Sequence, residues 1–141
     1  MEPIEVKFYN EIPDELVDFV VIACSYNDRW LWVKHKERNT YEMPGGHREE
    51  GESPDEAAER ELVEETGAIR YTIQSVSYYS VIGKTRVSLD GKEKYGKLYY
   101  AIIEEIGIIN SEIERYDLFD SLPKTLTYPE FNPVLYHSLI N

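Results

Sequence analysis

The chain has 141 residues, a length that fits one domain, and its hydrophobic fraction of 42% with 13% aromatic residues suffices for one core. Its formal net charge of -12 provides no broad basic surface, which excludes duplex nucleic acid and anionic membranes as general partners. An anionic ligand would need a few placed cations or bound metal ions. We expect a single domain over residues 1–141.

Cys24 is the only cysteine and lies in an apolar run. A disulfide within the chain is therefore excluded, and a buried, inert thiol is expected, which suits a reducing cytoplasm. No apolar run approaches the roughly 18 residues of a membrane-spanning helix. The N-terminal stretch is acidic, unlike a secretion signal. The sequence thus predicts a cytoplasmic protein that is neither secreted nor membrane-spanning.

The first third of the chain predicts a hairpin followed by a long loop. Residues 19–26 form an apolar run typical of a buried strand, Asn27–Asp28 a turn, and residues 29–35 a returning strand with alternating large apolar side chains. Residues 36–52 show no hydrophobic period and are rich in turn formers. We expect a loop there, of a length that usually carries function.

A helix is predicted after this loop. Ser53 is a typical N-cap, Pro54 suits the first helical position, and Glu56 completes a capping box with Ser53. Gly67 provides the stop. Only a narrow apolar stripe runs along the helix, so one face should pack on the protein while the remainder stays charged.

The second half of the chain predicts further strands and a closing helix. Residues 71–83 are typical of a strand, and Asp90–Gly91 indicate a hairpin turn between strands at residues 86–89 and 97–103. Residues 111–123 are expected to lead the chain out of the sheet. The C-terminal residues from 130 onward carry apolar side chains at helical spacing. Strands should therefore dominate, with one central and one terminal helix.

The central helix carries three glutamates on one face. Glu61, Glu64 and Glu65 stand at positions i, i+3 and i+4, which places neighbouring Cβ atoms about 5 to 6 Å apart. Carboxylates so placed can share a hard divalent cation such as Mg²⁺, which bridges protein carboxylates to substrate phosphates. The simpler alternative is a solvated helix face on which Arg60 pairs with Glu56 and Glu64.

The wider pattern favours a metal site. Seven residues match all invariant letters of the Nudix box, G-x5-E-x7-R-E-U-x-E-E-x-G-U with U a bulky aliphatic residue: Gly46, Glu52, Arg60, Glu61, Glu64, Glu65 and Gly67. A shuffled chain of this composition would contain them with a probability on the order of 10⁻⁵. Leu62 satisfies the first U, whereas Ala68 is smaller than the last. The chain therefore resembles the Nudix hydrolase family in this box and in its order of strands and helices.

The resemblance implies an α/β protein with the Nudix fold, an α/β/α sandwich around a mixed sheet. It implies that the three box glutamates bind Mg²⁺ or Mn²⁺ and carry catalysis, and that a carbonyl at Gly45 adds a ligand. Gly46 and Gly67 would be structural, and Glu52 would pair with Arg60 to hold the helix.

The implied activity is that of a pyrophosphohydrolase acting on a nucleoside diphosphate linked to another group. Cations neutralise the pyrophosphate, a carboxylate or metal deprotonates water, and attack at phosphorus expels a phosphate-bearing leaving group. The box leaves open which glutamate is the general base. Glu64 is our choice, because the middle glutamate could serve as ligand or as base.

A fourth carboxylate in this family often comes from beyond the box. Glu112 and Glu114 precede the stretch "YDLFDSLP", which resembles the family's segment at that place, and Glu112 is our candidate metal ligand. For either residue an exposed loop charge is an equally good alternative.

Basic residues flank the loop before the box and are candidates for contacts to substrate phosphate. Lys34, Arg38 and Arg48 are the contacts we select. Alternate residues of a strand share a face, so Lys34 and Lys36 cannot both face the same way as His35. The remaining basic residues are expected to be edge-strand charges.

The loop "YEMPGG" resembles that of the MutT-like and YtkD-like nucleoside triphosphate pyrophosphatases, which remove oxidised nucleotides such as 8-oxo-dGTP. In that subgroup an asparagine near the C-terminus reads the purine, which makes Asn132 a candidate. The alternative for Asn132 is a helix N-cap before Pro133. Trp30, Trp32 and Tyr41 could stack on a base or belong to the core.

The leading hypothesis is a Mg²⁺-dependent hydrolase that converts nucleoside triphosphates, including oxidised ones, to monophosphate and pyrophosphate. The alternatives are other Nudix substrates, namely RNA 5′ ends, ADP-ribose or nucleotide sugars, and a nucleotide-sensing module without catalysis. The net charge disfavours RNA, and a sensor would usually have lost box glutamates that this chain keeps. The resemblance also makes a homodimer plausible.

Overall fold

The computed structural model describes residues 4–85, 89–109 and 111–140. Its strands form one mixed sheet in the order β1-β6-β7-β2-β3-β4, with β5 beside β2 and β8 beside β3. The strands are β1 (Glu5–Tyr9), β2 (Val17–Tyr26), β3 (Arg29–His35), β4 (Tyr41–Glu42), β5 (Gly45–His47), β6 (Ala68–Ile82), β7 (Lys94–Ile106) and β8 (Ile113–Phe119). The helices are the 3₁₀ turn η1 (Asp14–Leu16), α1 (Pro54–Thr66) and α2 (Asn132–Ile140).

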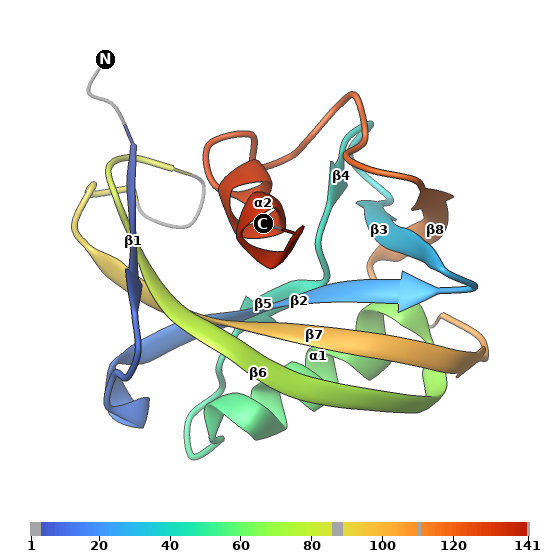
Figure 1. The fold of residues 1–141 in the computed structure, drawn as a ribbon, viewed down its shortest axis with the longest axis horizontal. Coiled ribbons are helices and arrows are strands. Elements are labelled where there is room, and N and C mark those ends of the chain that lie inside the picture. Colours follow the sequence, from blue (N-terminus) through green and yellow to red (C-terminus); the bar gives the residue numbers. More distant parts are fainter. Residues whose placement is uncertain (1–3, 86–88, 110, 141) are drawn as a thin grey trace.

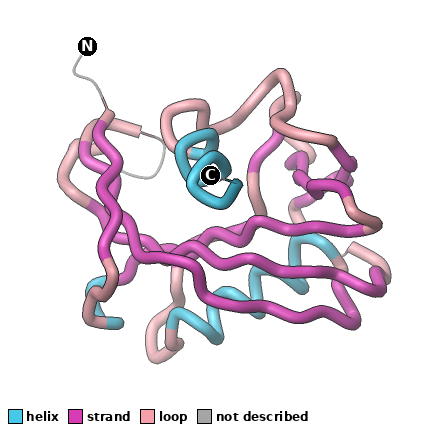
Figure 2. Tube along the Cα trace, in the orientation of Figure 1, coloured by secondary structure: helices cyan, strands magenta, loops and turns pink. Residues whose placement is uncertain are grey.

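The two α-helices lie on opposite faces of the sheet (Figure 1; Figure 2). Along β2, Val20 and Ile22 belong to the core cluster beneath α1, whereas Phe19 and Val21 belong to the cluster beneath α2. Successive strand residues point to opposite faces, so a strand covered on both sides needs the continuous apolar run seen in the sequence. The predicted α/β class and layered arrangement are confirmed.

The pairing of β2 brings the loop before α1 to the middle of the sheet. One edge of β2 pairs in parallel with β7. The other edge is shared, because Cys24–Tyr26 pair with β3 while Phe19–Val21 pair with β5. Gly45 and Gly46 therefore lie against the centre of the sheet, beside α1.

Helix α1 begins and ends as the sequence predicts. The Ser53 hydroxyl accepts a hydrogen bond from the Glu56 N–H at 3.1 Å, and the Glu56 carboxylate accepts one from the Ser53 N–H at 3.0 Å. Gly67 ends the helix with a φ of 76°, a left-handed conformation that favours glycine. Ala57, Ala58 and Leu62, all fully buried, form the packed stripe, whereas Val63, which we expected to belong to it, is exposed. The direction of the helix is thus fixed at both ends.

Two expectations from the sequence were wrong, and one strand was not foreseen. Residues 113–119 do not leave the sheet but form β8, which pairs antiparallel with β3. Their alternating charges suit a strand at a sheet edge, and these charges concealed the strand in the sequence. Residues 5–9 form the unforeseen strand β1, which pairs with the end of β6. The expected loop 36–52 contains the short strands β4 and β5.

The predicted hairpin at Asp90–Gly91 is present in altered form. β6 and β7 pair antiparallel, and the Gly83 N–H donates to the Gly91 carbonyl at 3.0 Å. Of the strand expected at residues 86–89, residues 86–88 lie outside the described part of the chain, and Leu89 lies in the turn. The strand expected at residues 97–103 is confirmed as part of β7.

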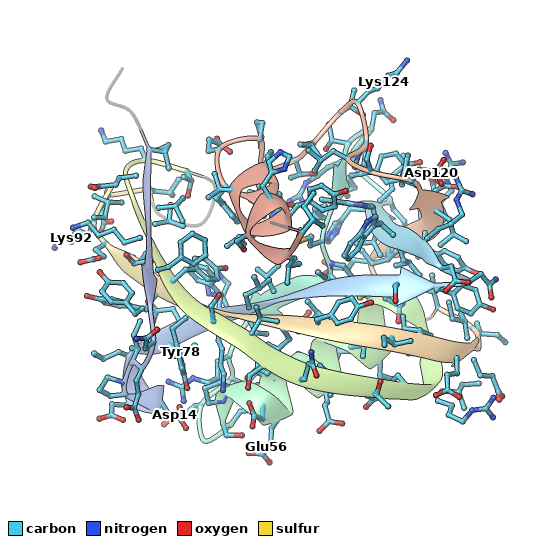
Figure 3. All side chains as sticks on the ribbon, viewed as in Figure 1. Asp14, Glu56, Tyr78, Lys92, Asp120 and Lys124 are labelled. Atoms are coloured by element: carbon cyan, nitrogen blue, oxygen red, sulfur yellow. The ribbon has the colours of Figure 1, made fainter. Side chains whose placement is uncertain are left out.

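Charged side chains such as Glu56, Lys92, Asp120 and Lys124 lie at the periphery of the molecule (Figure 3).

Cys24 is buried, as predicted, and burial raises the pKa of its thiol. Over the described ranges, no helix is both long and apolar enough to cross a membrane.

Candidate metal and nucleotide site

The box glutamates differ in burial. Glu61 and Glu65, one turn apart on α1, are 9% and 8% exposed. The side chain of Glu64 is 51% exposed. Two carboxylates thus face the sheet and the third remains in contact with water.

Arg60 joins the box into one polar network. Its guanidinium grips the Glu52 carboxylate with two hydrogen bonds of 2.7 and 3.0 Å. It also donates to the Glu61 carboxylate at 2.7 Å and to the His47 carbonyl at 3.1 Å. The Glu64 carboxylate lies 3.4 Å from the same guanidinium. Arg60 therefore pairs with Glu52, as the resemblance implies, and at the same time with Glu64 on the exposed side of the helix.

This network fixes the charge of its members. Hydrogen bonds from Arg60 and then from the Glu49 N–H lower the pKa of Glu52 to about 2. The hydrogen bond to Glu52 raises the pKa of Arg60 above its ordinary value. Both groups are charged across the physiological range, so the ion pair persists.

Glu65 has the least compensated carboxylate of the box. Its Oε1 accepts a hydrogen bond from the Gly45 N–H at 2.9 Å. Burial, with repulsion from Glu61, Glu42 and Glu64, nevertheless raises its pKa to about 8. Burial also raises the pKa of Glu61, although Arg60 opposes this shift. A buried carboxylate without a cation is costly, so the site favours a positive partner at Glu65.

The residues present fit a hard divalent cation. A Cβ on Gly46 would lie 2.7 Å from the nearer Glu61 oxygen, so a side chain at this position would displace that carboxylate. Carboxylate and carbonyl oxygens are the ligands that Mg²⁺ and Mn²⁺ prefer. Among the described residues no group of three acidic or histidine side chains already converges on one metal position. Arg60, between Glu61 and Glu64, accounts for part of this separation.

A pocket of about 450 Å³ has Gly45 and Gly46 in its wall, the two residues that also contact Glu65 and Glu61. Its walls come from β2, from the loop between β3 and α1, and from the segment before α2. It is lined by Phe19, Val20, Val21, Arg38, Glu42, Met43, Gly45, Gly46, His47, Leu89, Tyr128, Phe131 and Asn132. The pocket is mostly apolar and its polar groups are few, as is typical of small-molecule sites.

Asn132 is 2% exposed and lies in this pocket. Its Oδ1 accepts a hydrogen bond from the Met43 N–H at 3.3 Å, across 89 positions of sequence. This bond joins the start of α2 to the loop before the box, and it is not a capping bond. Tyr128 and Phe131, with ring centroids 5.0 Å apart and an interplanar angle of 30°, form the neighbouring wall.

Two of the predicted phosphate contacts are engaged elsewhere. Lys34 follows Trp32 on the α2 face and donates to the Glu114 carboxylate at 2.8 Å. Arg48 donates to the carbonyls of Val17, Glu52 and Glu15 at 2.8, 2.9 and 3.3 Å. Arg48 thereby ties the box loop to the start of β2. The structure brings neither residue into the pocket.

Arg38 does line the pocket, and it donates to the Glu42 carboxylate at 2.9 Å. Glu112 is exposed and lines a second cavity of about 340 Å³ together with His35 and Arg38. The Glu112 carbonyl accepts a hydrogen bond from the Lys36 N–H at 3.0 Å. Glu112 thus lies beside His35 and Arg38, outside the pocket wall and outside the cluster of buried carboxylates.

Sequence reasoning missed several residues of the site. The candidates for base stacking, Trp30, Trp32 and Tyr41, do not line the pocket, and Trp32 is a core residue. Tyr128 and Phe131 line it instead, and their position just before Asn132 was the available indication. Other missed residues are Glu42, 5% exposed beside Arg38, and His35.

The chain is similar in sequence to known proteins. A NUDIX domain model matches residues 16–101. The Bacillus subtilis (strain 168) protein "Putative 8-oxo-dGTP diphosphatase YtkD" is 29% identical over 136 residues, covering 96% of this chain and 72% of that protein. An RNA pyrophosphohydrolase of Mannheimia succiniciproducens is 34% identical over 56 residues, covering 40% of this chain and only 28% of that protein.

Solved structures of known hydrolases have similar folds. A mutant of the Bacillus subtilis pyrophosphohydrolase BsRppH is similar with a TM-score of 0.71 and 28% identity, covering 97% of this chain and 84% of that one. A UDP-X diphosphatase, at 21% identity and a TM-score of 0.67, shares the fold, covering 86% of this chain and 61% of that one. With the family model matching more than half of the chain, this protein belongs to the Nudix family of hydrolases.

Proposed function

We propose that this Nudix hydrolase cleaves nucleoside triphosphates, oxidised purine triphosphates among them, to a nucleoside monophosphate and pyrophosphate. The observation that carries the proposal is the position of the pocket. Glu42, Gly45 and Gly46 belong both to its wall and to the surroundings of the buried carboxylates. A nucleoside held in this pocket directs its phosphates toward α1. The buried free thiol of Cys24 suits such an enzyme in a reducing cytoplasm.

Glu61 and Glu65, with the carbonyl of Gly45, would hold Mg²⁺ or Mn²⁺. The bound cation supplies charge neutralisation at the phosphate oxygens. Glu64 is the box glutamate that water reaches directly, and we assign it the general base. It takes the proton as the water oxygen attacks phosphorus, and the bond from phosphorus to the bridging oxygen breaks to release pyrophosphate.

Recognition of the base is assigned to the wall formed by Asn132, Phe131 and Tyr128. The Asn132 amide offers hydrogen bonds inside an apolar pocket, where a missing partner is costly. The two rings, tilted by 30° to each other, offer a surface for a flat base. The YtkD relative, whose name gives 8-oxo-dGTP as substrate and which aligns with nearly the whole chain, supports an oxidised purine.

Arg38 is the phosphate contact that we retain. It lies at the pocket wall, and its side chain is 32% exposed. Lys34 and Arg48 are not assigned to substrate, because Glu114 and backbone carbonyls occupy them. Glu112 receives no ligand role in this proposal.

The test is product analysis with Mg²⁺ over canonical and oxidised nucleoside triphosphates, ADP-ribose, nucleotide sugars and 5′-triphosphate RNA. We expect monophosphate and pyrophosphate from a nucleoside triphosphate, with one oxidised purine preferred. Turnover confined to RNA ends or to a non-triphosphate would overturn the substrate assignment. Nucleotide binding without turnover of any compound would indicate a sensing module instead.

A further inference from the structure

A second polar network lies beside Glu65, apart from the one built on Arg60. The Arg38 guanidinium donates to Glu42 Oε1 at 2.9 Å. His35 Nε2 lies 3.5 Å from Glu42 Oε2 and 3.9 Å from Glu65 Oε2. These two distances exceed that of a tight hydrogen bond, and they place one imidazole nitrogen between two carboxylates. His35, Arg38 and Glu42 come from β3, the turn after it and β4, all outside the box.

The local fold fixes this arrangement. Val33 pairs with Glu42 in the β3–β4 ladder, which places Glu42 on the face that carries α1. His35 is two residues beyond Val33 and shares its face. The Arg38 N–H donates to the His35 carbonyl at 3.2 Å and closes the turn. The Glu42 side chain is 7% exposed and that of His35 18%, so both are shielded by their neighbours.

We propose that His35 and Glu42 are positioning residues that hold the Glu65 carboxylate in the orientation that binds the divalent cation. This inference rests on the metal site of the proposed function. The Gly45 N–H fixes Oε1 of Glu65, whereas His35 is the side chain placed toward Oε2. Second-layer contacts of this kind orient metal ligands, and their loss typically weakens metal affinity or activity by about 10- to 100-fold.

Glu42 and Arg38 complete the arrangement. Glu42 Oε2 is the second carboxylate oxygen near His35 Nε2, at 3.5 Å. The charge of Glu42 is one of the charges that repel Glu65, and the Arg38 guanidinium, 2.9 Å from Glu42, partly offsets it. This explains why a carboxylate can be 5% exposed so near the box glutamates.

The test is Mn²⁺ binding to the full chain without nucleotide, followed by electron paramagnetic resonance. His35→Leu removes the N–H, and we expect Mn²⁺ to bind about tenfold more weakly. His35→Gln keeps an N–H donor and should recover most of the affinity. His137→Gln, an exposed histidine on α2, is the matched control and should leave binding unchanged. Thermal unfolding of each variant establishes that it is folded.

A double-mutant cycle separates positioning from charge. Glu42→Gln removes a negative charge near the cation, which alone weakens binding in any background. If Glu42 acts through His35, the Glu42→Gln substitution must weaken Mn²⁺ binding less in the His35→Leu background than in the wild-type protein. Equal effects in both backgrounds would remove Glu42 from the proposal.

The outcomes distinguish this inference from the function beneath it. If the wild-type protein and His35→Leu bind Mn²⁺ equally well, the inference is overturned and the metal site stands. If the wild-type protein binds no Mn²⁺, both the inference and the proposed metal site are overturned. At saturating metal, a fall in kcat for His35→Leu with KM for the nucleotide unchanged supports positioning, whereas a rise in KM alone would contradict it.

Discussion

The two faces of the sheet differ in how they are held. On the α1 face, charged side chains are tied into networks, with Arg60 bonded to Glu52 and Glu61. On the α2 face, aromatic and aliphatic side chains form the pocket wall, with Asn132 as a buried polar group. In the function that we propose, the charged residues of the α1 face carry the chemistry, the mostly apolar residues of the α2 face recognise the base, and the two faces meet at Gly45–Gly46. Changes on one face should therefore leave the function of the other intact.

Replacing the proposed base should have the largest effect. Glu64→Gln keeps the shape of the side chain and removes the proton acceptor, so we expect kcat to fall by about 10²- to 10⁴-fold. KM for the nucleotide should change little, because the pocket is untouched. Steady-state kinetics checks this, with Glu59→Gln on the same helix as control. Full activity in Glu64→Gln would remove the assignment.

Replacing Asn132 should affect the opposite face. Asn132→Ala removes the buried amide, and kcat/KM for the preferred purine triphosphate should fall about tenfold. Mn²⁺ affinity should not change. Competition between purine and pyrimidine triphosphates provides the measurement, and undiminished discrimination would place base recognition elsewhere.

Gly45 and Gly46 lie where the two faces meet, and a side chain at either position should disturb the protein in a different way. A Cβ on Gly45 would lie 2.3 Å from the Val20 carbonyl oxygen, which is rigid backbone. Gly45→Ala should therefore lower the free energy of unfolding by about 1–3 kcal/mol. A Cβ on Gly46 meets the movable Glu61 carboxylate instead. Gly46→Ala should weaken Mn²⁺ binding with a smaller loss of stability, and chemical denaturation compares the two.

Glu65 should give the metal-free protein an unusual pH dependence. Its pKa is about 8 in the folded chain against 4.5 ordinarily, so between these values the folded state binds the extra proton. Stability contributed by this group falls as pH rises through that window, by at most about 1.4 kcal/mol per pH unit. Denaturation in EDTA from pH 5 to 9 measures the slope. Glu65→Gln should reduce it, and an unchanged slope would refute the cause.

The smallest effect is expected at Lys34. Its amine pairs with Glu114 on the α2 face, at the sheet edge. Lys34→Ala should leave kcat and KM unchanged and cost less than about 1 kcal/mol of stability. A clear rise in KM would restore Lys34 as a phosphate contact.

The α1 face could be predicted because its residues lie in one segment with fixed spacing. Capping by Ser53 and Gly67 and the burial of Cys24 follow from local pattern, whereas the Glu52–Arg60 pair follows from the resemblance to the Nudix box. The pocket could not be predicted in full, because pairing of β2 with β5 and the Asn132–Met43 bond join distant segments. Strand β8 escaped because edge strands tolerate charges that resemble those of a loop.

The most direct test of the account is a crystal structure with Mn²⁺ and a non-hydrolysable purine nucleoside triphosphate analogue. The anomalous signal locates the metal, and the density of the analogue locates the base. We expect Mn²⁺ at Glu61 and Glu65 beside Gly45, with the base against Asn132 and Phe131. A base bound outside this pocket, or Mn²⁺ bound away from α1, would contradict it.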